Sequence, residues 1–274
     1  MSMAVTRLGR HTWVWVLTLG VILFVADQQT LAATADPNFV PSVILLGAVV
    51  VPAAFVAFVY GRRLPYDMPV GIVVTTAVLG GVIGTIVAGV LEFSTLRDLG
   101  VLPLLAVGAI EEAAKLIVPL GVLLLFRYRR PAGGIVVGVA SGAGFAALET
   151  MGYAFVALIR THGDVSAVAN LLVLRGLLSP ASHMAWTGVT AAALWSAAAA
   201  GWSLQSVRRF VAIFVTVALL HALWDGLTML VGYAVIAGAS IGLLAWITHR
   251  AAHGENILDR RGLRRMAIST RPPR

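Results

Sequence analysis

The chain has 274 residues, of which 59% are hydrophobic and only 12% are charged. A soluble domain usually carries about 25% charged residues, so this composition excludes a soluble enzyme, a disordered chain and a disulfide-stapled secreted domain. The chain has no cysteine, which also excludes thiol nucleophiles and Cys-ligated zinc.

Runs of about 20 apolar residues, the length that crosses a hydrocarbon core of about 30 Å, predict eight membrane helices. They lie at about 12–33, 40–60, 69–91, 100–126, 133–159, 179–203, 209–227 and 229–248. Asp27 interrupts the first run, which is either an uncleaved anchor, as we favour, or a signal peptide cleaved near Ala35. The predicted fold class is an all-α polytopic membrane helix bundle of residues 1–249, with a motif-bearing core at 100–228 and a basic tail at 250–274.

Basic residues are distributed unevenly among the segments that connect these helices. Sixteen arginines fall in the N-terminal segment, in alternate loops and in the tail, whereas the other loops hold only Arg97, Arg160 and Arg175. By the positive-inside rule this split predicts that both termini are cytoplasmic. The net charge of +8 therefore reflects topology and not nucleic-acid binding, and we expect the tail to lie against anionic lipid headgroups.

Small residues recur every four positions on two of the predicted helices. They are Gly80, Gly84 and Ala88 on one helix and Gly134, Gly138, Gly142 and Ala146 on another. Because helices in lipid associate by close approach of their backbones, we interpret both stripes as packing faces. The short loops predict one compact helical domain.

Seven ionisable residues lie within or at the outer ends of the apolar runs, where a charge costs about 2.5–3.5 kcal/mol on insertion scales and marks a functional site by default. They are Glu111, Glu112, Lys115, Glu149, His183, His221 and Asp225. Helical spacing lets Lys115 pair with either neighbouring glutamate and lets Asp225 orient His221. Pro119 removes the amide that would bond the Lys115 carbonyl, so we expect a kink there. Their estimated depths bring the carboxylates and histidines together in the outer half of the bilayer.

The ordered motifs on successive helices resemble those of the PrsW family of bacterial intramembrane proteases, which cleave membrane-anchored anti-sigma factors. The motifs are EExxK, FxxxE, a histidine in HMAWTG, and HxxxD, within residues 100–228. The related CAAX prenyl-protein endopeptidases have similar motifs. This resemblance implies a water-activating role for Glu111, with Glu112 and Lys115 as companions, and site roles for Glu149, His183, His221, Asp225 and, as a supporting residue, Arg175. The sequence departs from the family at Thr150, where an asparagine is common.

These observations predict hydrolysis of a peptide bond in a single-pass membrane protein, near the extracytoplasmic side and without a cofactor. Glu111 accepts the proton of water, His221 stabilises the oxyanion, and Glu149 or His183 orients the water or protonates the leaving amine. The alternative is a zinc site with Glu149, His183 and His221 as ligands. A proton-coupled transporter and a non-catalytic membrane scaffold of the same fold remain open as other functions.

Overall fold

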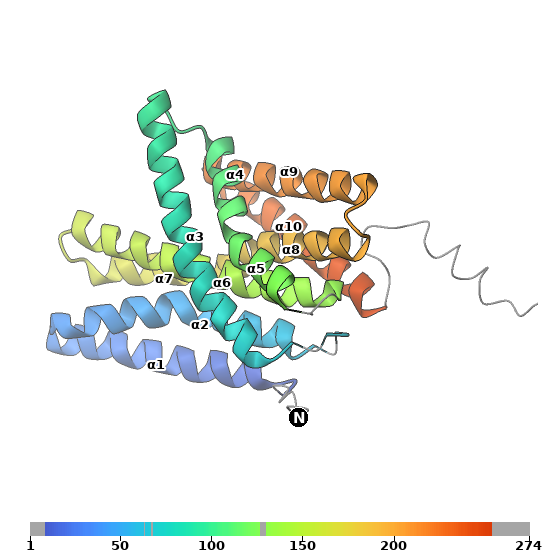
Figure 1. Ribbon diagram of the computed structural model, residues 1–274. Helices are drawn as coiled ribbons and strands as arrows, with labels where there is room; N and C mark the ends of the chain where they lie inside the picture. The colour runs from blue at the N-terminus through green and yellow to red at the C-terminus, as the bar shows by residue number, and fades with distance from the viewer. Residues whose placement is uncertain (1–8, 63, 67, 127–129, 254–274) are drawn as a thin grey trace, which may run out of the picture.

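The computed structural model describes residues 9–62, 64–66, 68–126 and 130–253, and within these ranges the secondary structure is helical, without strands. The helices are α1 Thr12–Thr34, η1 Pro37–Phe39, α2 Val40–Tyr60, α3 Val70–Leu99, α4 Leu104–Lys115, α5 Ile117–Leu125, α6 Pro131–Arg160, α7 Val165–Leu178, η2 Ser179–Ala181, α8 His183–Ala199, α9 Leu204–Gly226 and α10 Leu230–Ala252. The predicted all-α polytopic bundle is therefore confirmed (Figure 1).

Seven stretches of the described chain are long and apolar enough to cross a membrane, which makes this a multi-pass membrane protein. They comprise α1, η1 with α2, α3, α6, the run from α7 to α8, α9 and α10. The fourth predicted span is divided at Leu116 into α4 and α5, each of which is too short to cross alone. This break is the kink predicted from Pro119, and the hydroxyl of Ser141 donates to the freed Lys115 carbonyl at 2.7 Å.

The prediction of a loop before residue 179 is wrong, because α7 occupies residues 165–178. Polar residues at His162, Asp164 and Asn170 interrupt the apolar run there, although Asp164 in fact caps α7 by accepting from the backbone of Ser166 and Ala167. A candidate span therefore runs from 165 to 199, with a break just before His183. His183 therefore lies near the middle of this span. The depth estimated from the sequence instead placed it about one turn inside the outer end of its helix.

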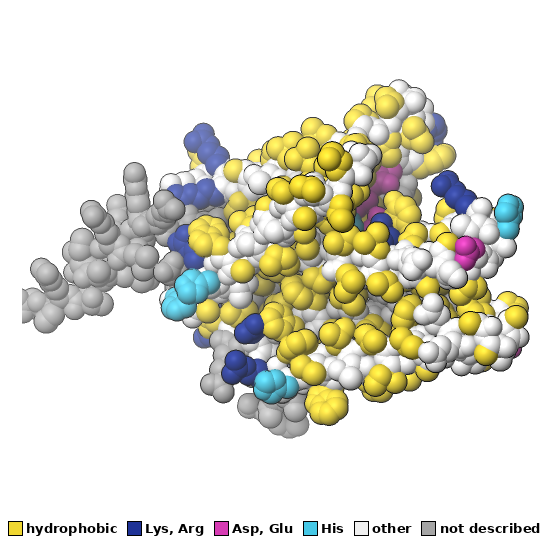
Figure 2. Space-filling model, turned by 180° about the vertical axis from the view of Figure 1, so that it is seen from behind, with side chains coloured by type: hydrophobic (Ala, Val, Ile, Leu, Met, Phe, Trp, Pro, Cys, Tyr) yellow, Lys and Arg dark blue, Asp and Glu magenta, His cyan; other side chains and the backbone are white. Residues whose placement is uncertain are grey.

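The helices alternate in direction, so that the starts of α1, α6 and α9 lie at the same end of the bundle as the ends of α2, α5 and α8 (Figure 1). Figure 2 shows that the lysine and arginine side chains gather mainly at one end of an otherwise apolar surface. This uneven distribution is the one that the sequence predicted. The side of the membrane that this end faces stays a prediction, and residues 254–274 of the predicted basic tail lie outside the described part of the chain.

Helix α6 is the centre of the bundle, and its glycines allow α3 and α8 to approach it closely. A methyl group added to Gly138 would lie 2.3 Å from the carbonyl oxygen of Thr187, and one on Gly142 would lie 2.4 Å from that of His183. On the α3 side, a methyl on Gly80 would meet the hydroxyl of Ser141 at 2.4 Å. Both small-residue stripes therefore include packing contacts, and the stripe on α6 brings the backbone of His183 directly against that helix.

Candidate active site

Ionisable side chains from four helices meet in the interior of the bundle. Glu111, Glu112 and Lys115 come from α4, His183 from the start of α8 and His221 from α9, and all five are buried. Glu149 of α6 joins them through an ion pair with His183. The residues that the sequence predicted as one site are therefore neighbours in the structure.

Lys115 is completely buried and bonds to three of these groups. Its ammonium donates to Oε1 of Glu112 at 2.7 Å, to Oε2 of Glu111 at 3.3 Å and to Nδ1 of His183 at 2.8 Å. The same nitrogen lies 4.4 Å from the centre of the Phe145 ring. Lys115 thus pairs with both glutamates at once and connects α4 to α8.

The spacing of His221 and Asp225 predicts that Asp225 orients the imidazole, but in the structure Glu112 makes the shorter contact with it. Nδ1 of His221 donates to Oε1 of Glu112 at 2.8 Å, across 109 residues of sequence. Its Nε2 faces two other carboxylates, Oε2 of Glu111 at 3.4 Å and Oδ2 of Asp225 at 3.5 Å. One hydrogen bond therefore holds Nδ1 and leaves Nε2 directed at Glu111.

His183 is held in a matching way by Glu149. Because a lysine ammonium can only donate, Nδ1 of His183 accepts from Lys115, and Nε2 therefore carries the proton. That Nε2–H lies 2.9 Å from Oε2 of Glu149. The guanidinium of Arg175 donates to the same carboxylate oxygen at 2.8 Å and to the hydroxyl of Thr150 at 3.2 Å. Arg175 of α7, a supporting residue in the sequence prediction, therefore positions Glu149.

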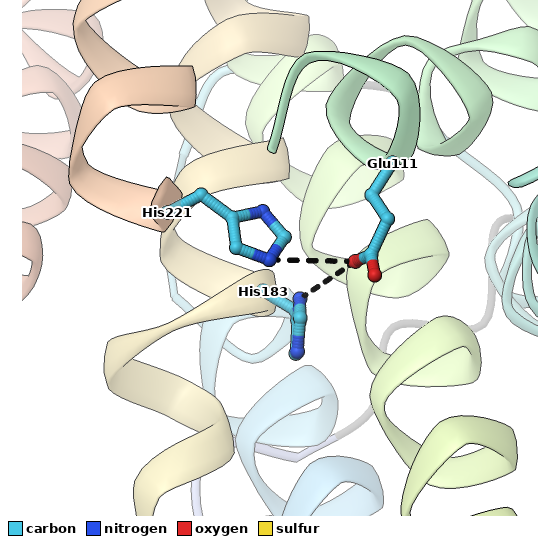
Figure 3. A group of neighbouring side chains, drawn as sticks. All are labelled: Glu111, His183 and His221. Atoms are coloured by element: carbon cyan, nitrogen blue, oxygen red, sulfur yellow. Dashed lines mark ion pairs between the residues drawn. The ribbon is translucent and has the colours of Figure 1, made fainter. Parts of the chain in front are cut away.

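The chemistry of these donors fits a divalent metal ion. Glu111, His183 and His221 each offer one ligand atom, and these atoms lie within 4.8 Å of one another (Figure 3). The His183 nitrogen that faces Glu111 is Nδ1, which accepts from Lys115, so a metal ion there would take the place of that hydrogen bond. Two imidazoles and a carboxylate are a common ligand set for catalytic zinc, and the other nitrogen of each ring bonds a carboxylate, as in many zinc sites. In the zinc alternative of the sequence analysis Glu149 was the third ligand. The geometry favours Glu111 in that place, because Glu149 bonds Nε2 on the far side of the His183 ring.

A cavity of about 400 Å³ lies beside this cluster. Its lining combines apolar side chains with hydroxyl and charged groups from α6, α7, η2, the start of α8 and the α9–α10 region, including Glu149, Tyr153, Arg175, His183, Asp225 and Tyr233. Figure 2 shows acidic side chains in a recess of the largely apolar surface. A peptide segment that entered this cavity would contact Glu149 and His183 directly.

Glu92 of α3 is a further carboxylate near the site, and the sequence analysis did not include it among the candidates. It interacts electrostatically with Glu111, Glu149, His221 and Asp225, and its Oε1 is buried without a hydrogen-bond partner among the described residues. A signal was present in the sequence, because Glu92 continues the four-residue spacing of Gly80, Gly84 and Ala88. It was assigned to the end of a span instead, since the predicted third helix stopped at residue 91, whereas α3 continues to Leu99.

Comparison with known proteins agrees with the motifs and the geometry. The model of a family described as PrsW family intramembrane metalloprotease matches residues 68–251, a longer range than the motif-bearing core. No curated protein and no solved structure matches the chain. The word metalloprotease in the family's description, together with the cluster of Glu111, His183 and His221, favours the metal-containing alternative more than the sequence analysis did.

Proposed function

Because the chain belongs to the PrsW family of intramembrane proteases, we propose that the buried cluster hydrolyses a peptide bond of a membrane-anchored protein by activating a water molecule at Glu111. The observation that carries this proposal is the convergence of Glu111, His183 and His221 on one point beside a cavity of about 400 Å³. A proton-coupled transporter would also use buried carboxylates and histidines, but the match to a protease family favours hydrolysis over transport or a scaffold role.

Glu111 is the group that we assign to the attacking water. Its Oε2 is within 3.4 Å of His221 Nε2 and 4.0 Å of His183 Nδ1. A water bound there would touch the carboxylate and Nε2 of His221, whereas Nδ1 of His183 already accepts from Lys115. A general base must lie within hydrogen-bond reach of the proton that it abstracts. Glu111 accepts this proton. His221, whose two ring nitrogens both face carboxylates, acts in its doubly protonated form, and its Nε2–H then stabilises the negative charge that develops on the carbonyl oxygen of the substrate.

The remaining residues hold these groups in place and complete the proton transfers. Glu112 fixes the ring of His221 through the 2.8 Å bond to Nδ1, while Glu149 and Arg175 fix His183. Glu149 and His183 also line the cavity, so they are placed to protonate the leaving amine. Asp225 lines the same cavity and faces Nε2 of His221.

The family's description supports a second form of this site, in which Glu111, His183 and His221 would hold a metal ion. A bound zinc ion would supply Lewis acidity and a more acidic water. In this form Glu149 and Asp225, which are not among the three ligands and which line the cavity, are the carboxylates placed to accept a proton. Exhaustive chelation with measurement of metal content separates the two forms: loss of cleavage that zinc restores supports the metal, and full cleavage by metal-free protein supports the glutamate form.

The test of the proposed function is cleavage of a single-pass membrane protein in proteoliposomes. We expect Glu111→Gln to abolish cleavage, because the amide keeps the shape of the side chain but cannot accept the proton. Arg160→Gln, a charge change in the last turn of α6, serves as a control and should cleave normally. Retained cleavage in Glu111→Gln would refute the assignment of the base.

We propose an anti-sigma-factor-type protein as the substrate, by resemblance to the family, with the cut near the extracytoplasmic side. Glu111 lies seven residues from the start of α4, and His221 lies five from the end of α9, which supports a site nearer that side of the bundle. Comparing the membrane proteomes of cells with the wild-type protein and with Glu111→Gln tests this. The substrate should accumulate as a stabilised single-pass protein, and the absence of any such protein would count against it.

A further inference from the structure

Trp186 of α8 packs between the two histidines of the site and α10. Its ring centre lies 4.8 Å from that of His221 at an interplanar angle of 30°, and 5.6 Å from that of His183 at 80°. The indole N–H donates to the hydroxyl of Ser240 at 2.8 Å. Trp186 and Ser240 are each 1% exposed, so their hydrogen bond is fully enclosed by protein.

The hydrogen bond that His221 donates to Glu112 leaves the rotation of the His221 ring about that bond undetermined. A single bond at Nδ1 fixes the direction of that nitrogen, but the ring can still rock about this bond and swing Nε2 away from Glu111. The indole, with its centre 4.8 Å away and its plane inclined by 30° to the imidazole, blocks this motion on one side, since rocking the imidazole toward it would drive the ring into the indole face. Reactive groups that are misplaced by about 1 Å can lose about a hundredfold in rate, so the plane of this ring matters for catalysis.

Ser240 determines where the indole itself lies. A buried indole N–H without an acceptor is costly, so the ring adopts the position in which Nε1 meets the Ser240 hydroxyl. Helix α10 carries none of the ionisable residues of the site, yet it contacts α8 through this bond. Trp224 also packs against the Trp186 indole. Its ring centre lies 5.9 Å from that of Trp186 and 4.8 Å from that of Tyr233 of α10.

We propose that Trp186 and Ser240 are positioning residues for peptide hydrolysis: Ser240 anchors the indole of Trp186, and the indole holds the ring plane of His221 toward Glu111. This inference rests on the proposed protease function of the same cluster. Neither residue touches the cavity that we assign to the substrate. Their loss should therefore lower kcat and leave KM unchanged.

The experiment compares Ser240→Ala, Ser240→Thr and Trp186→Phe with the wild type in the cleavage assay. Ser240→Ala should lower kcat by about tenfold or more, the usual effect of removing a group that orients a reacting residue, and Ser240→Thr should restore most of it because the hydroxyl remains. Trp186→Phe should resemble Ser240→Ala. In protein with 15N-labelled tryptophan, the indole resonance missing from Trp186→Phe should shift in Ser240→Ala and return in Ser240→Thr, whether or not the protein is active.

Two matched changes on α8 control for simple loss of packing. Ser196 and Trp195 are both fully buried, and the Ser196 hydroxyl bonds only within its own helix, to Ala192. Ser196→Ala and Trp195→Phe should keep the wild-type kcat. A wild-type kcat in Ser240→Ala, an unmoved indole resonance, or no rescue by threonine would overturn the inference. Absence of cleavage by the wild type would instead overturn the proposed function, so the two failures are distinguishable.

Discussion

Replacing Gly142 by alanine should damage the site without touching an ionisable group. The added methyl would lie 2.4 Å from the carbonyl oxygen of His183 and 3.0 Å from Cα of Met184, whereas ordinary contacts begin at 3.4 Å. Because both neighbours are backbone atoms, no side chain can rotate to make room. The start of α8 must therefore move away from α6 by about 1 Å, carrying His183 with it.

The effect on activity should exceed the effect on stability. Alanine gains about 1 kcal/mol over glycine in a helix, and overpacking costs about 1–3 kcal/mol, so unfolding free energy should fall by no more than about 2 kcal/mol. A displacement of about 1 Å in a reacting group, in contrast, costs about a hundredfold in rate. Gly142→Ala should consequently remain folded and cleave very slowly.

Gly152→Ala provides the matched control, because it makes the same change on the same helix. A methyl at Gly152 meets nothing within 4 Å, so this variant should be as stable as the wild type or more so, with unchanged cleavage. The measurements are thermal unfolding in detergent and kcat in proteoliposomes. Equal kcat for the two variants would show that close packing of α6 against His183 does not set the geometry of the site.

Two further predictions concern the buried charges. Lys115→Met should lower the free energy of unfolding by about 3–5 kcal/mol, because removing one partner of a buried pair leaves Glu112 and Glu111 without their cation; an unchanged denaturation midpoint would contradict this. Glu92→Gln should not lower the melting temperature, since it removes a carboxylate that is repelled by Glu111 and has a buried oxygen without a hydrogen-bond partner in the described part of the chain. A clear drop in the melting temperature of Glu92→Gln would indicate that a partner stabilises the charged form of Glu92.

The sequence predicted the features that depend on local pattern. Apolar runs located most of the helices, because a backbone in lipid must satisfy its hydrogen bonds within a helix. Pro119 located the break between α4 and α5 for an equally local reason, the missing amide. The run from 165 to 178 was misread because its polar residues resemble a loop by hydropathy, although the helix packs Leu172 fully inside the protein.

Pairing between helices was decided only by the tertiary structure. Spacing suggested Asp225 as the partner of His221 because the two are one turn apart. In the structure, however, Nδ1 of His221 donates to Glu112, which is 109 residues away in the sequence. In the same way, the sequence offered Glu149 as a ligand in the zinc alternative, whereas its bonds to His183 and Arg175 place it on the outer side of the His183 ring. A sequence shows which ionisable groups lie in the membrane, since each is costly there; which atom faces which depends on how closely glycine-lined helices approach, and that is set by packing across the whole bundle.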